Sequence, residues 1–116
     1  MTVQRTITIL SSAARAASGT ADIGGIASEF DSADIFIDVT AASGTSPSLT
    51  VTYQASVDGG TTWFDVTSGA ALTAVGKQII NVPSKLGAMG RLSYVISGTT
   101  PSFTFSALAQ FRRSGN

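Results

Sequence analysis

A chain of 116 residues with 12% charged residues and a formal net charge of zero is long enough for one domain with its own core and too short for two ordinary ones. It contains no cysteine and no histidine, which excludes a disulfide framework, a thiol metal site and the commonest general base. Ser, Thr, Gly and Ala replace the missing charges, and this composition is typical of an all-β protein with a hydroxyl-rich surface.

The chain starts Met-Thr-Val-Gln-Arg without an apolar run of signal-peptide length, and no window approaches 18 apolar residues. We therefore expect a soluble product made inside the cell, with no membrane contact. A virion component released by lysis has the same properties. So few charges also suggest that neighbours cover part of the surface, although Ser and Thr can solubilise a small β-domain equally well.

Period-two alternation predicts the strands in chain order. Residues 3–10 form a first strand, and we expect residues 1–20 to be an N-terminal strand or an extended arm that could add to a neighbour. The remainder, 21–116, is predicted to be a single β-sandwich domain. The clearest strand in its first part is 33–40. Phe36 lies on the polar side of this strand and is expected to meet a neighbouring strand or a partner.

The same turn sequence occurs twice, as Gly-Thr-Ser-Pro from Gly44 to Pro47 and as Gly-Thr-Thr-Pro from Gly98 to Pro101. Glycine can adopt positive φ and proline fixes φ near −65°, so each copy is predicted to be a hairpin turn between two strands. Two matching hairpins indicate a compact antiparallel domain with internal pseudo-symmetry.

Another hairpin is predicted at Asp58-Gly59-Gly60, because Asp-Gly and Gly-Gly supply the positive φ that tight turns require. The surrounding sequence, Ser-Val-Asp-Gly-Gly-Thr-Thr-Trp over 56–63, resembles the Asp-box hairpin of sialidase-type propellers. A propeller repeats the box in several blades, and this chain has it once. The resemblance therefore implies the hairpin only, with no catalytic residue.

Further strands are predicted at 62–67, at 77–82 before Pro83, and at 91–97 and 102–112. About eight short strands at this spacing predict an all-β antiparallel sandwich, either immunoglobulin-like or jelly-roll-like.

The sequence offers no candidate catalytic, cofactor-binding or metal-binding residue, so we expect no enzyme activity and no cofactor. A serine or threonine nucleophile needs a base and an orienting group, and neither lysine stands in a Ser-Lys motif. The glycine pairs lack the strand–loop–helix context of a phosphate-binding loop. Asp31, Asp34 and Asp38 fit no standard calcium loop and are interpreted as a solvated acidic face.

The charges are segregated along the chain. All seven acidic residues lie from Asp22 to Asp65, and all seven basic residues lie outside that stretch. Such asymmetry can steer contacts between copies, or the two groups can pair within one fold. The bases lack the clustering and interleaved aromatics of a nucleic-acid footprint. The candidate interface residues are Arg5, Arg15, Phe36, Arg112 and Arg113.

A family resemblance rests on the order of these motifs. An Ile/Val strand, the Gly-Thr-Ser-Pro-Ser turn, Ser-x-Asp-Gly-Gly-Thr-Thr-Trp, Gly-Arg-Leu-Ser-Tyr-Val-Ile and Gly-Thr-Thr-Pro-Ser before Phe-Thr-Phe follow one another over 33–111. This order is similar to small β-sandwich proteins encoded among the structural genes of tailed bacteriophages. The resemblance implies a capsid decoration (cement) protein on the virion surface, with the major capsid protein and copies of itself as partners.

Two other functions stay open. One is a tail or baseplate accessory protein of the same phages. The other is a carbohydrate-binding module, because four aromatic residues could form either a sugar-stacking platform or part of the core. These residues are Tyr53, Trp63, Phe64 and Tyr94.

Overall fold

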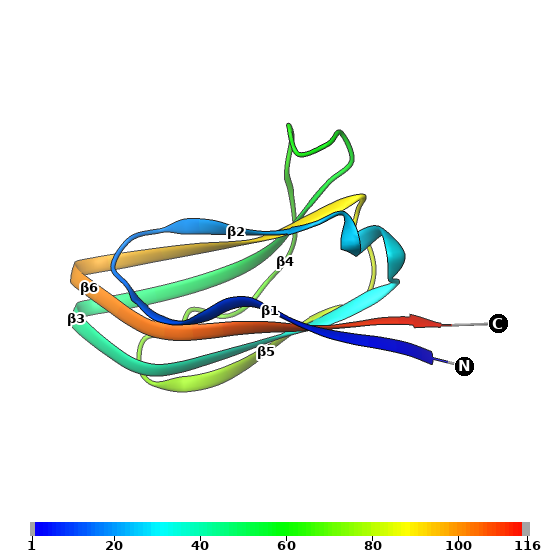
Figure 1. Cartoon of the computed structure of the whole chain (residues 1–116). Coiled ribbons are helices and arrows are strands. Elements are labelled where there is room, and N and C mark those ends of the chain that lie inside the picture. Colours follow the sequence, from blue (N-terminus) through cyan, green and yellow to red (C-terminus); the bar gives the residue numbers. More distant parts are fainter. Residues whose placement is uncertain (1, 115–116) are drawn as a thin grey trace.

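The computed structural model describes residues 2–114, apart from the side chains of Thr2, Ile26 and Ser114. Alternating small, β-branched and aromatic residues place most of the described residues in antiparallel strands, and these residues include one short 3-10 turn, η1 (Figure 1). The elements are β1 (Thr2–Arg15), β2 (Gly19–Gly24), η1 (Gly25–Glu29), β3 (Ser32–Ser56), β4 (Phe64–Ser68), β5 (Gly76–Val82) and β6 (Met89–Ser114).

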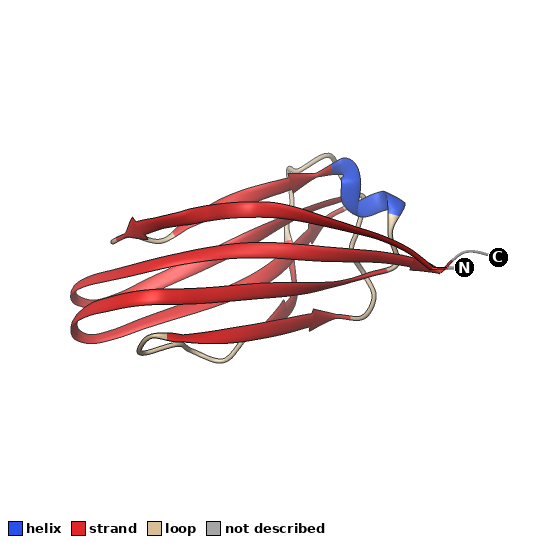
Figure 2. Cartoon of the chain, turned by 60° about the horizontal axis from the view of Figure 1, so that its bottom comes forward, coloured by secondary structure: helices blue, strands red, loops and turns tan. Residues whose placement is uncertain are grey.

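Two long strands, β3 and β6, pair antiparallel along their whole length, from Ser32 opposite Arg112 to Ser56 opposite Met89. Strands β1 and β2 both pair with β6, and β4 and β5 both pair with β3. The ribbon of β3 and β6 bends back at one end of the molecule, and both termini lie at the other end (Figure 2). The sheet is therefore folded over on itself, which makes a two-layer antiparallel sandwich.

Each layer contains four strand segments. The first layer consists of β1, β6 from 102 onward, β3 up to 43, and β5. The second layer consists of β2, β6 up to 97, β3 from 48 onward, and β4. The predicted all-β antiparallel class is confirmed. The six strands of the described chain correspond to the eight predicted segments because β3 and β6 each contribute to both layers.

The two copies of the repeated turn face each other at the bend, where the register of β3 and β6 shifts. Gly44 has φ 108° and Gly98 has φ 121°. A Cβ on Gly98 would lie 2.8 Å from the Ser46 carbonyl oxygen, and a Cβ on Gly44 would lie 2.7 Å from that of Thr100. Each glycine thus allows the backbone of the opposite copy to approach.

The prediction that these two sequences form hairpin turns was wrong. The segments on either side of Gly44–Pro47 belong to different layers and pair with β6, not with each other, and the same holds at Gly98–Pro101 with β3. The glycine and proline residues of the repeated sequence correctly indicated that the chain bends there. It could not reveal the pairing partner, because that contact joins residues far apart in the sequence.

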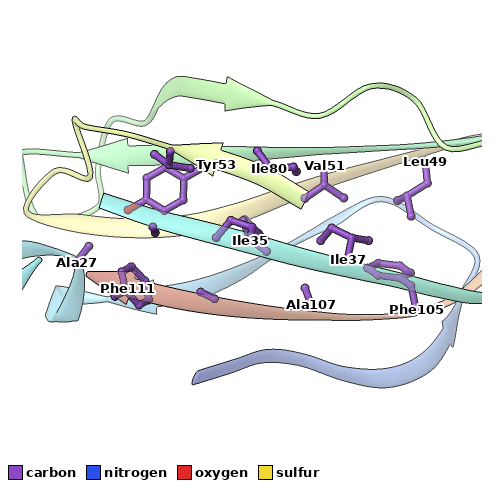
Figure 3. Packing of buried hydrophobic residues seen from close by; sticks show 14 of the residues in the cluster. Ala27, Ile35, Ile37, Leu49, Val51, Tyr53, Ile80, Phe105, Ala107 and Phe111 are labelled. Carbon is purple, nitrogen blue, oxygen red and sulfur yellow. The ribbon is translucent and has the colours of Figure 1, made fainter. Parts of the chain in front are cut away.

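The core lies between the layers, where the inward positions of both sheets meet (Figure 3). Ile35, Ile37 and Val39 from the first layer are buried against Leu49, Val51 and Tyr53 from the second. Phe103, Phe105 and Phe111 of β6 are also fully buried. The buried residues alternate along each strand, as the period of two requires.

The N-terminal segment was expected to be a strand or an arm, and over Thr2–Arg15 it is a strand. Residues Thr2–Thr8 pair with Leu108–Ser114 in unbroken register, and register shifts follow between Thr8, Leu10 and Ala13. Ile7, Ile9 and Leu10 pack against the edge of the core. Burial of these side chains holds β1 on the first layer.

Candidate functional site

The outer face of the first layer carries an exposed apolar row across three strands. Phe36 of β3 lies opposite Ile79 of β5 on one side and opposite Leu108 of β6 on the other. Directly opposed residues share a face of the sheet, so the three side chains are neighbours. Phe36 is 39% exposed and Ile79 is 63% exposed. Together with polar neighbours they line a shallow hollow of about 280 Å³.

Polar pairs border this apolar row on both sides. Asp38 lies opposite Lys77, with 3.4 Å between Oδ1 and Nζ. On the other side Asp34 accepts hydrogen bonds from Arg112 and, at 2.7 Å, from the Asn81 amide. These two donors, Arg112 first, hold the pKa of the Asp34 carboxyl below its ordinary value. The face therefore has the apolar centre and polar rim of a protein-binding surface.

The outer face of the second layer is different. Thr52 lies between Ser68 and Ser93, and its hydroxyl is 2.7 Å from that of Ser68. Beside this hydroxyl row, Gln54 donates to Asp65 at 2.7 Å and accepts from Arg91 at 2.7 Å. The polar side chains of this face are satisfied by one another, and Val95 is exposed beside them. The two outer faces therefore have different chemistry.

The predicted hairpin at Asp58-Gly59-Gly60 is confirmed, because β3 and β4 pair on either side of it. Asp58 accepts hydrogen bonds from the Thr62 N–H at 2.9 Å, the Thr61 N–H at 3.1 Å and the Ser56 hydroxyl at 2.9 Å. Bonds from Thr62, followed by those from Ser56 and Thr61, lower the pKa of Asp58 to about 2. The Asp58 carboxylate thus stabilises the hairpin loop.

Trp63 completes this hairpin and is not an open platform. Its indole N–H donates to the Gly60 carbonyl at 2.9 Å, and the Arg91 guanidinium lies 4.2 Å from the ring centroid. Tyr53 is fully buried with its hydroxyl on the Leu86 carbonyl, whereas Tyr94 packs on Phe105 in the first layer. Phe64, next to Trp63, is 59% exposed, so the four aromatic residues proposed for sugar stacking do not share one surface.

The five candidate interface residues do not form one cluster. Arg15 donates to the Phe105 carbonyl at 2.8 Å and lies 4.7 Å from that ring, so its charge is used within the fold. Arg112 is likewise committed to Asp34. Arg5 and Arg113 are exposed, and Phe36 alone belongs to the apolar row. Part of the charge asymmetry is thus resolved by pairing inside the molecule.

Ile79 and Leu108 were missed by the sequence reasoning. The signal for Ile79 was available, because one of two adjacent isoleucines in a strand must point outward. Leu108 alternates with buried Ala107 and Ala109, so its outward position was also readable. The alignment of Ile79 and Leu108 with Phe36 could not be predicted from the sequence, because it depends on how β5 and β6 are paired with β3.

Across the described chain, no cluster of three acidic, histidine or cysteine side chains has the arrangement of a metal site. Asp34 and Asp38, which the sequence placed in an acidic face, each pair with a base. No helix within residues 2–114 has the length and apolarity needed to span a membrane.

No protein-family model matches the chain, and no curated protein matches it. Several solved structures share its fold. A chain from Bacillus endospore appendages, described as disulfide-linked pili, is 18% identical with a TM-score of 0.55, over 97% of this chain and 89% of that one. The SPBc2 prophage-derived protein YomS is 10% identical with a TM-score of 0.51, over 95% of both chains.

A chain of infectious bursal disease virus, strain Gx, is 17% identical with a TM-score of 0.53. The likeness covers all of this chain but 33% of the viral one, so this chain spans about a third of that protein. At these identities the comparisons establish the fold. The protein is an all-β antiparallel sandwich of the jelly-roll-like class, found in proteins of a virus, a prophage and a bacterial appendage.

Proposed function

We propose that this protein is a structural component of a tailed-phage virion that binds the outside of the capsid and stabilises it as a decoration protein. The observation that carries the proposal is the apolar row of exposed Phe36 and Ile79 and half-buried Leu108, with its polar rim. The binding energy of one such contact can be modest, but the stabilisation of a whole shell is large because many copies bind at once.

Three further features support this role. The motif order resembles phage structural proteins, and the fold is shared with a prophage-derived protein and a viral chain. The low charge fits a surface that is partly covered. The expected partners are the major capsid protein and copies of itself. The protein is made in the host cytoplasm and resides on the capsid surface, with no catalytic role.

The location is tested by mass spectrometry of separated heads and tails from the phage that encodes the protein. Decoration predicts many copies on purified heads and none on tails. Recovery on tails alone would replace the proposal with the tail or baseplate role. The carbohydrate-binding alternative loses its main support, because Tyr53 and Tyr94 are not on a common surface with Trp63.

The surface is tested by binding purified variants to heads that lack the protein. Phe36→Asp and Ile79→Asp should weaken binding at least about tenfold, since central apolar anchors contribute most to an interface. The matched control is Val95→Asp, because Val95 is 54% exposed on the outer face of the second layer. Circular dichroism verifies folding of each variant. Equal weakening by Val95→Asp would contradict the assignment of the face.

A further inference from the structure

The edge of β1 is a second surface, distinct from the apolar row. Strand β1 pairs with β6, makes a few contacts with β2 near the bend, and has no strand on its other side within the described chain. An open edge presents unpaired backbone N–H and C=O groups, and natural proteins protect such edges with charges, prolines or bulges.

The other three edges of the sandwich are formed by strands at most half as long as β1. Strand β2 has six residues and a register shift after Asp22, and β4 has five residues and a shift opposite Tyr53 and Gln54. At the edge of β5 the Gln78 amide donates to the Ala70 carbonyl at 2.9 Å, which ties the 69–75 loop to that strand.

The first half of β1 lacks this protection. Residues 2–8 pair with β6 without a bulge, contain no proline, and carry one charge, on Arg5. The bulges of β1 come later, between Thr8 and Ala13, and Arg15 at its far end is folded onto Phe105. A regular edge that carries one charge in seven residues, three of them threonine, is a good template for another strand.

We propose that this edge pairs with the same edge of a second copy, so that two first layers join into one continuous antiparallel sheet across a twofold axis. A twofold contact makes the edge meet itself, so the register decides whether like charges collide. Centring on Arg5 would place the two arginines opposite each other. Centring on Thr6 places Thr6 opposite Thr6 of the second copy and Arg5 opposite Ile7.

The Thr6-centred register also agrees with the faces of the strand. Gln4, Thr6 and Thr8 are exposed on the outer face, and Gln4 would lie opposite Thr8 of the second copy. Cross-strand threonine and amide pairs of this kind stabilise a sheet, whereas like charges directly opposite destabilise it. The formal net charge of zero adds no long-range repulsion between copies.

The absence of cysteine makes a crosslinking test clean. Directly opposed Cα atoms in an antiparallel pair are about 4.5–5.5 Å apart, which a disulfide can bridge. Thr6→Cys should therefore oxidise rapidly to a covalent dimer. Thr20→Cys is the matched control, because Thr20 is an exposed threonine on the short edge strand β2. It should oxidise at least about tenfold more slowly.

Light scattering of the wild-type protein after size exclusion provides an independent measurement. The wild type should show a concentration-dependent dimer, and Thr6→Lys should remain monomeric because it places two charges opposite each other. A monomeric wild type at every concentration, or a dimer in which Thr6→Cys crosslinks no faster than Thr20→Cys, overturns the proposal. The inference deepens the self-association in the proposed function, but it is tested without capsids, so its failure leaves the capsid proposal intact.

Discussion

Replacing Gly98 with alanine should be strongly destabilising, because two separate costs fall on one methyl group. Gly98 has φ 121°, which an L side chain rarely adopts. The added Cβ would also lie 2.8 Å from the Ser46 carbonyl oxygen and 3.0 Å from Pro47 Cα, and both are backbone atoms that cannot turn away. Holding a strained φ costs about 1–3 kcal/mol and overpacking costs about 1–3 kcal/mol.

We therefore expect Gly98→Ala to lower the free energy of unfolding by roughly 3–4 kcal/mol, a large share of the roughly 5–15 kcal/mol of a typical domain. Equilibrium urea denaturation measures this loss, and a decrease of about 3 kcal/mol would lower the midpoint by about 2 M at an m-value near 1.5 kcal/mol/M. Gly44→Ala should behave alike, because Gly44 has φ 108° and faces the Thr100 carbonyl oxygen at 2.7 Å.

Two other glycines separate the causes. A Cβ on Gly59 would meet nothing within 4 Å but φ is 79°, so Gly59→Ala measures the strain alone, about 1–2 kcal/mol. A Cβ on Gly76 would also meet nothing, and φ there is not in the strained range, so Gly76→Ala should be neutral or stabilising by a few tenths of a kcal/mol. If Gly98→Ala costs no more than Gly59→Ala, the close approach of the two repeats contributes nothing to the loss of stability.

Two further predictions concern the hairpin and the core. Hydrogen bonds from Thr62, Ser56 and Thr61 hold the pKa of Asp58 at about 2 in the folded protein. The ionised carboxylate therefore stabilises the folded state fully above pH 3.8, the pKa of the unfolded chain, and this stabilisation is lost as the pH falls through about 2. An NMR titration should find this pKa and should find it raised in Ser56→Ala; an unchanged value in that variant would remove the hydroxyl from the explanation. Tyr53→Phe should cost about 1–2 kcal/mol because it leaves the buried Leu86 carbonyl without its 2.8 Å hydrogen bond. Thermal unfolding with Thr73→Ala as an exposed control checks this, and equal melting temperatures for the two variants would refute it.

Much of the protein could be predicted from short stretches of sequence. Alternation over 33–40 predicted a strand with Phe36 on its polar side, because successive side chains in a strand point to opposite sides whatever the strand pairs with. The Asp58 hairpin was equally readable, since its carboxylate bonds only to residues within four positions along the chain. Phe36 on a polar face was a correct indication of an exposed surface.

What could not be predicted depended on contacts between distant residues. Gly44 and Gly98 looked like two separate hairpin turns, but the backbone of each lies against the other copy, so their role is a property of the pair. Ile79, Phe36 and Leu108 form one row only because two registers align them. Arg15 looked available for a partner until the fold brought Phe105 and Tyr94 beneath it. Period and turn chemistry are local and can be read along a chain, whereas register and layer are set by burial between segments that the sequence does not place side by side.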